Sequence, residues 1–126
     1  MYPAIESILN LTIIIEINHK GGLVMSKMDK QNRLVVPHRL IKISKTDFSK
    51  EVRLFVRGKE LFLDNASSRH SSCNCLGQVL LDTHNRFFVP KLAREILNLK
   101  SGDNFSFYVQ NGSITFKKVF FIPENR

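Results

Sequence analysis

The segment Asp29-Lys-Gln-Asn-Arg-Leu-Val-Val-Pro37 decides the interpretation of this chain, because it occurs again as Asp82-Thr-His-Asn-Arg-Phe-Phe-Val-Pro90. Five of the nine positions are identical, and the two segments lie 53 residues apart. Without gaps, the match extends over 36 positions, seven of them identical. Similarity at a fixed offset is typical of a repeated structural unit. The sequence therefore predicts two copies of one unit within a single chain.

Each copy predicts the same order of elements: a strand, a turn, a second strand, a helix and a hairpin. The turn is indicated by the Asp and Asn residues of the repeated segment. The apolar runs that predict the strands are Leu23–Met28 and Leu34–Val36 in the first copy, and Leu76–Leu81 and Phe87–Val89 in the second. Pro37 and Pro90 suit the first position of the helices that follow, where a missing N–H costs nothing.

The helix of the second copy is expected to end at Ser101-Gly102-Asp103. Its apolar residues at helical spacing are Leu92, Ile96 and Leu99, with Ala93 and Leu97 beside them. The first copy predicts a shorter and weaker helix that runs through Leu40 and Ile43 and ends near Ser44.

A hairpin closes each copy. Alternation predicts one buried face for its first strand, made of Val52, Leu54 and Val56 in one copy and of Phe105, Phe107 and Val109 in the other. Asn111-Gly112 is a strong turn signal, and Arg57-Gly58 is its weaker counterpart. The return strands are expected at Glu60–Leu63 and Ser113–Lys117.

These elements predict a fold that is mostly β with short helices. The 126 residues, 43% of them hydrophobic, are enough for one packed core, whereas each half alone would be marginal. The halves must therefore pack together or oligomerise. The expected organisation is an N-terminal extension (1–22), a first unit (23–64), a polar linker (65–75), a second unit (76–118) and a C-terminal tail (119–126). Within the extension, residues 13–17 could add a strand, the region could form a helix, or it could lie upstream of a chain that begins at Met25.

The charge favours a polyanionic partner. The chain carries 19 Lys and Arg against 11 Asp and Glu, a net charge of +8. Residues 27–64 contribute +5 and residues 76–126 contribute +3, so the positive charge is concentrated in the two copies. A basic balance of this size is typical of chains that associate with nucleic acid.

The D-x-x-x-R turn, followed by an apolar strand, Pro, a short helix and a hairpin, resembles the AbrB/MazE/SpoVT superfamily of swapped-hairpin β-barrel DNA-binding domains. The resemblance covers residues 23–64 and 76–118. It implies a swapped-hairpin barrel built from two interlocked halves, and a regulator of transcription that binds double-stranded DNA in the cytoplasm, in association with the nucleoid, as a homo-oligomer. The tandem arrangement is similar to MraZ-type regulators, although the copies here are closer together and residues 1–22 have no counterpart there. Either one chain completes a barrel, or each copy pairs with a second chain.

Arg33 and Arg86 are the first candidates for DNA contact, since the resemblance implies that the Arg of this motif faces DNA. An arginine fork also suits phosphate and guanine edges. The alternative is that each Arg forms an internal ion pair, with Asp29 or Asp82, that braces the turn. The other candidate DNA-binding residues are Lys27, Lys30, Arg39, Lys42, Lys91 and Arg94. Lys42 and Arg94 are the ones that match an arginine pair of the family after the Pro.

Other classes of function are less well supported. No catalytic motif is found, so we expect no enzyme. His70, Cys73 and Cys75 are too few for a structural zinc site, so we expect no metal and no cofactor. Two cysteines without a disulfide framework favour a reducing compartment, and no apolar run is long enough to predict a membrane span or a signal peptide.

Two alternatives to DNA binding remain open. An antitoxin-like or other protein-interaction module would use the same fold, although the ten residues after Phe116 are few for wrapping a partner. A structural assembly subunit is the other. The ten Phe residues are interpreted mainly as core, with Phe55 and Tyr108 as candidates for exposed exceptions.

Overall fold

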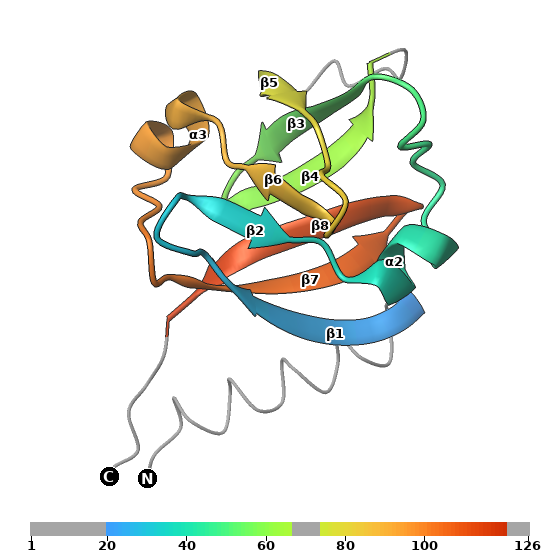
Figure 1. Ribbon diagram of the computed structural model, residues 1–126, viewed down its shortest axis with the longest axis horizontal. Helices are drawn as coiled ribbons and strands as arrows, with labels where there is room; N and C mark the ends of the chain where they lie inside the picture. Colours follow the sequence, from blue (N-terminus) through green and yellow to red (C-terminus); the bar gives the residue numbers. More distant parts are fainter. Residues whose placement is uncertain (1–19, 67–73, 121–126) are drawn as a thin grey trace, which may run out of the picture.

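The computed structural model describes residues 20–66 and 74–120 (Figure 1). The strands are β1 (Lys20–Lys27), β2 (Arg33–Val35), β3 (Val52–Arg57), β4 (Glu60–Asn65), β5 (Asn74–Val79), β6 (Arg86–Phe88), β7 (Asn104–Gln110) and β8 (Ser113–Val119). The helices are α2 (His38–Ile43) and α3 (Lys91–Ile96). The prediction of a mostly β fold with short helices is thus confirmed.

The strands form one large sheet and one small one. The large sheet has the order β1-β7-β8-β4-β3-β5, and all of its neighbours are antiparallel. It is open, with β1 and β5 as its edges, so the pairing of the described strands does not close it into a barrel. The small sheet consists of β2 and β6, which cross in front of the large sheet in Figure 1.

Each sheet contains strands from both parts of the chain. β1 pairs with β7, and β5 pairs with β3, so each hairpin receives an outer strand from the other part of the chain. Two further ladders join the parts: β2 with β6, centred on Leu34 opposite Phe87, and β4 with β8, centred on Phe62 opposite Thr115. In both central pairs, the partners lie 53 residues apart in the sequence.

A cluster of aromatic rings connects the two sheets. Phe107 stacks on Phe116 with 4.7 Å between ring centroids, and Phe87 meets Phe116 edge-on at 6.0 Å. Leu34 and Phe87 are fully buried on the inner face of the small sheet. The small sheet is therefore fixed to the core through its inner face, which leaves its other face outward.

The helices differ from their predicted bounds. Pro37 and Pro90 cap the helices rather than occupying their first turn, and both helices have six residues, so the first one is not the shorter. α3 ends well before Leu99, because Asn98 adopts a left-handed φ of 54° and the Leu99 N–H bonds to the Arg94 carbonyl. This is the Schellman pattern that terminates helices.

The buried face of α3 is also narrower than predicted. Leu92 and Ile96 are 47% and 56% exposed, whereas Ala93 is fully buried. A six-residue helix completes fewer than two turns, so only one residue of each helix, Leu40 or Ala93, lies fully in the core.

Both hairpins are present. Asn111 and Gly112 form the second turn, with φ values of 54° and 84°, as predicted. The first turn is Gly58-Lys59 rather than Arg57-Gly58, because Arg57 is still paired with Glu60. Only its first residue needs a positive φ, which Gly58 supplies at 64°.

The hairpin strands were expected to bury one face only, but in the middle of β3 and β7 both faces are buried. Phe55 and Tyr108 are buried, although they were the candidates for exposed aromatic residues. Phe55 stacks on Phe62 at 5.5 Å, and the Tyr108 hydroxyl donates to Glu60 Oε2 at 2.7 Å. Polar and aromatic partners therefore cover the second face. Of the Phe and Tyr residues that the structure describes, Phe88 and Phe120 are the exposed ones.

The first strands of both parts begin within segments predicted to lie outside the units. β1 starts at Lys20, inside the expected extension, and β5 starts at Asn74, inside the expected linker. The proposed strand or helix at residues 13–17 lies outside the described residues, as do His70 and Cys73. In the described part of the chain, no helix has the length and apolar character needed to cross a membrane.

Candidate nucleic-acid interface

The turn between β1 and β2 is held by one carboxylate. Asp29 Oδ1 accepts the backbone N–H groups of Gln31 and Arg33 at 2.9 and 2.8 Å, and Asp29 Oδ2 accepts Arg33 Nε at 2.8 Å. Asn32 adopts a φ of 62°, a conformation that Asn tolerates better than most residues. The Asp and Asn of the motif therefore shape the turn, as predicted from turn chemistry.

The turn between β5 and β6 has the same geometry. Asp82 Oδ1 accepts the N–H groups of His84 and Arg86 at 2.8 and 2.9 Å, and Asp82 Oδ2 accepts Arg86 Nε at 2.8 Å. Asn85 has a φ of 61°. The two turns are joined reciprocally: Val36 N–H donates to the Asn85 carbonyl, and Val89 N–H to that of Asn32.

The outward face of the β2–β6 ladder brings the two arginines together. Arg33 lies opposite Phe88, and Arg86 lies opposite Val35. Since directly opposed residues of a ladder share a face, these four side chains form one outward surface, which we call the β2–β6 face. Arg33 and Arg86 are diagonal neighbours on this ladder, and such neighbours are separated by about 7–8 Å at the backbone.

The ion pair predicted as an alternative to DNA contact is present in both turns, but it engages only part of each arginine. A guanidinium has five N–H donors, and Nε alone is bonded to Asp29 in Arg33 and to Asp82 in Arg86. The Nη groups form no hydrogen bond with the residues that the structure describes. The arginines are thus anchored and still have donors to offer.

Electrostatics keep the two carboxylates ionised. The backbone N–H of Arg86 is the main cause that lowers the pKa of Asp82 to about 2, with further help from the N–H of His84 and the Arg86 guanidinium, against an opposing effect of desolvation. Desolvation raises the pKa of Asp29, but the bonds from Arg33 and Gln31 together outweigh it and leave the pKa lowered. Each turn is therefore an Asp–Arg pair of nearly zero charge.

Uncompensated charge comes from other candidate residues. Lys27, Lys30, Arg39 and Lys42 are exposed and form no ion pair within residues 20–66 and 74–120. Lys27 ends β1 and Lys30 lies in the following turn, so both belong to the segment that carries Arg33. This part of the surface has an excess of positive charge.

The candidate DNA-binding residues on α2 and those on α3 do not lie close together. Figure 1 shows α2, which carries Arg39 and Lys42, and α3 at opposite ends of the small sheet. On α3, Lys91 approaches Glu95 at 3.9 Å, and Arg94 Nε donates to the Val89 carbonyl at 3.1 Å. Arg94 therefore braces the start of its own helix.

Val35 and Phe88 are site residues that the sequence interpretation missed. They are 45% and 65% exposed, and the Arg33 guanidinium lies 5.8 Å from the centre of the Phe88 ring. Alternation within the strand could have found them: a residue two positions after an outward arginine shares its face. The apolar character of both runs pointed instead to the core.

Comparisons with protein-family models, curated proteins and solved structures found no match for this chain. Its function is therefore inferred from the fold and from the β2–β6 face. Across the described ranges 20–66 and 74–120, no three His, Cys, Asp or Glu side chains are grouped as metal ligands would be. Cys75 is a free, exposed cysteine on β5.

Proposed function

We propose that this chain is a transcription regulator that binds duplex DNA through the β2–β6 face and its flanking turns. The observation that carries the proposal is the placement of Arg33 and Arg86 as diagonal neighbours on one outward ladder. Each is fixed through Nε and keeps its Nη groups for a ligand. Anchored arginine forks suit bidentate contacts to phosphate or to guanine O6 and N7.

The surrounding charge supports a polyanion as the ligand. Lys27 and Lys30 add uncompensated charge beside the first turn, whereas their counterparts beside the second turn, Leu80 and Thr83, are uncharged. The first turn is thus the more basic of the two. In the proposed complex, phosphate contacts supply most of the affinity, and base edges or groove shape supply the sequence preference.

We further propose that the chain is an internal repeat folded as interlocked, swapped hairpins, as the resemblance to the AbrB/MazE/SpoVT superfamily predicts. The strand order β1-β7-β8-β4-β3-β5 supports this. If each strand is exchanged for its counterpart in the other copy (β1 for β5, β3 for β7, β4 for β8), the same order results, read in the opposite direction. The offset of 53 residues at the centre of both joining ladders supports it as well. One chain would then present two D-x-x-x-R turns related by an approximate two-fold axis.

Salt dependence and paired variants test the DNA-binding proposal. If about five phosphates are neutralised, the logarithm of the association constant should fall with the logarithm of salt concentration at a slope of about −4 to −5. The change Arg33→Ala with Arg86→Ala should weaken binding by a factor of ten or more, since one good bidentate contact is worth about 1–3 kcal/mol. Fluorescence anisotropy with labelled duplex DNA, after selection from a random pool, measures both quantities.

The matched control is Arg53→Ala with Arg57→Ala, which removes the same charge from β3. It should reduce binding only through the loss of general charge, by much less than the variant on the β2–β6 face. Circular dichroism establishes that both variants are folded. Binding that is indifferent to salt, or equal losses in the two double variants, would contradict the proposal.

A protein partner is the second candidate for the same surface, and Val35 and Phe88 favour it. Exposed aromatic and apolar residues beside arginines are typical of the centre of protein interfaces. The partner would be a second copy of the chain or another protein. The change Phe88→Ser tests this: a lower mass by light scattering with unchanged DNA affinity would assign the face to protein contact.

A further inference from the structure

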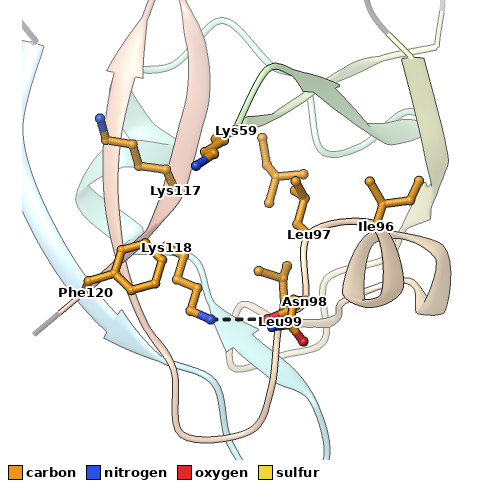
Figure 2. Close-up of a pocket in the computed structure, with 9 residues that line it drawn as sticks. Lys59, Ile96, Leu97, Asn98, Leu99, Lys117, Lys118 and Phe120 are labelled. Carbon is orange, nitrogen blue, oxygen red and sulfur yellow. Dashed lines mark hydrogen bonds between the residues drawn. The ribbon is translucent and has the colours of Figure 1, made fainter.

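A groove of about 430 Å³ lies between the end of α3 and strand β8, away from the β2–β6 face (Figure 2). Most of its lining is apolar. Leu61 and Leu99 are buried beneath it, whereas Ile96 and Phe120 are 56% and 70% exposed beside it. Apolar side chains that converge on a concave site of this volume are typical of small-molecule sites.

The polar part of the lining is cationic. Lys59 and Lys117 border the groove and form no ion pair with the described residues. Lys118 is already committed, because its Nζ lies 3.1 Å from Asp103 Oδ2 and donates to the Asn98 carbonyl at 3.2 Å. Figure 2 shows the Lys117 ammonium turned away from Leu97 and Ile96, so Lys59 is the nearer of these two cations for an anionic group of a ligand.

The corresponding place in the first part of the chain, 53 residues away, is closed. There, Lys45 N–H donates to the Gly112 carbonyl at 2.7 Å, and Thr46 Oγ1 donates to the Leu63 carbonyl at 3.0 Å. The Lys45 side chain packs so tightly on Gly112 that a Cβ there would meet Lys45 Cδ at 2.9 Å. The segment after α2 is thereby bonded to the β7–β8 hairpin.

The segment after α3 lacks these two bonds at the equivalent positions, although Lys118 on β8 donates to its Asn98 carbonyl. Asn98 and Leu99 correspond to Lys45 and Thr46, and Lys59 stands where the other hairpin has Gly112. Among the described residues, no hydrogen bond joins Asn98 to Lys59 or Leu99 to β8. Since the equivalent segment after α2 is bonded to its neighbouring hairpin, the fold does not require a groove at this place. The groove after α3 depends on its own residues.

We propose that this groove binds a small anionic amphiphile, a molecule with an apolar chain or ring and a carboxylate at one end. The apolar part covers Ile96, Leu97 and Phe120, and the carboxylate pairs with Lys59, with Lys117 as the second cation at that end of the groove. Both parts of the ligand contact groups that residues 20–66 and 74–120 leave exposed or partly exposed. The proposal does not depend on DNA binding, and its test involves no DNA.

The test is a titration of the full chain with octanoate, followed by NMR chemical shifts, beside a titration with 1-octanol as the uncharged analogue. Octanoate should give saturable shifts at residues of the groove. The change Lys59→Ala with Lys117→Ala should weaken octanoate by about three- to ten-fold, as expected for exposed ion pairs, and leave 1-octanol binding unchanged. Lys42→Ala with Lys50→Ala, which removes equal charge at exposed positions outside the groove, should alter neither.

A second pair of variants tests the apolar part. Ile96→Ser with Phe120→Ser changes two exposed positions, so the fold should persist, and both ligands should lose affinity. The proposal is overturned if octanoate gives no saturable shifts in the groove, or if these serine variants bind it as the unchanged chain does. Binding of an acidic amphipathic peptide in place of octanoate would overturn it too.

Discussion

Asp29 and Asp82 have two effects on the surface that they share with the arginines. Each carboxylate holds its turn through two backbone N–H groups and fixes the arginine through Nε. Each also cancels most of the charge of that arginine. The Asp–Arg pairs therefore fix the geometry of the turns but add almost no net charge. The positive charge that attracts a polyanion comes from lysines such as Lys27 and Lys30.

This arrangement predicts a loss of stability in acid. The pKa of Asp82 is about 2 in the folded chain, against an ordinary value of 3.8. A lowered folded-state pKa stabilises the fold above the unfolded value, and the contribution is lost as the pH falls from about 4 to 2. Thermal unfolding followed by circular dichroism should show a steeper fall in Tm over that range for the unchanged chain than for Asp82→Asn. Equal slopes would contradict the role given to this carboxylate.

At the scale of elements, Phe116 on β8 is the centre of the core. Its ring contacts those of Phe87, Phe105 and Phe107, with centroid distances of 6.0, 6.0 and 4.7 Å. These contacts join β6 of the small sheet to β7 and β8 of the large one. The orientation of the β2–β6 face therefore depends on this cluster.

The change Phe116→Ala should lower the free energy of unfolding by about 3–5 kcal/mol, as is typical of a buried phenylalanine. Phe120→Ala is the matched control, since that side chain is 70% exposed and should change stability by less than about 0.5 kcal/mol. Urea denaturation measures both. A small effect of Phe116→Ala would mean that the cluster does not organise the core.

Local sequence patterns predicted these elements well where turn residues and strand alternation determine the backbone conformation. The Asn111-Gly112 turn and the strands beside the two D-x-x-x-R turns follow from turn chemistry and alternation. Helix ends and burial were less predictable, because Asn98 stops α3 through a left-handed conformation that no periodicity reveals. Phe55 and Tyr108, the candidates for exposed aromatic residues, are buried, whereas Phe88, interpreted with most Phe residues as core, is exposed. Their exposure depends on which strands lie across them.

At the scale of the whole molecule, the two parts of the chain complete each other's sheets. β1 pairs with β7 and β5 pairs with β3, while β2–β6 and β4–β8 join the parts again. The small size of each half predicted that they would have to pack together, but not which strands would pair. The candidate site shows the same difference between local and long-range information. Local sequence motifs predicted Arg33 and Arg86, but their placement on one face depends on the long-range pairing of β2 with β6.

Such interleaving predicts one cooperative unfolding transition. Leu54→Ala, a change at a fully buried position of β3, should cost about 2–5 kcal/mol and lower the urea midpoint of every strand together. NMR signals from β3–β4 and β7–β8, followed through a urea titration, measure the two hairpins separately. A lowered midpoint in β3–β4 alone would show that the parts fold independently.

The most direct test of the account is a map of where DNA touches the molecule. Amide chemical shifts should be recorded as a duplex selected from a random pool is added to the chain. We predict that the largest changes occur at Arg33–Val35, at Arg86–Phe88 and in the turn that holds Lys30, and that they shrink as salt is raised. Changes confined to β4 and β8, or no change at low salt, would contradict the claim that the β2–β6 face binds DNA.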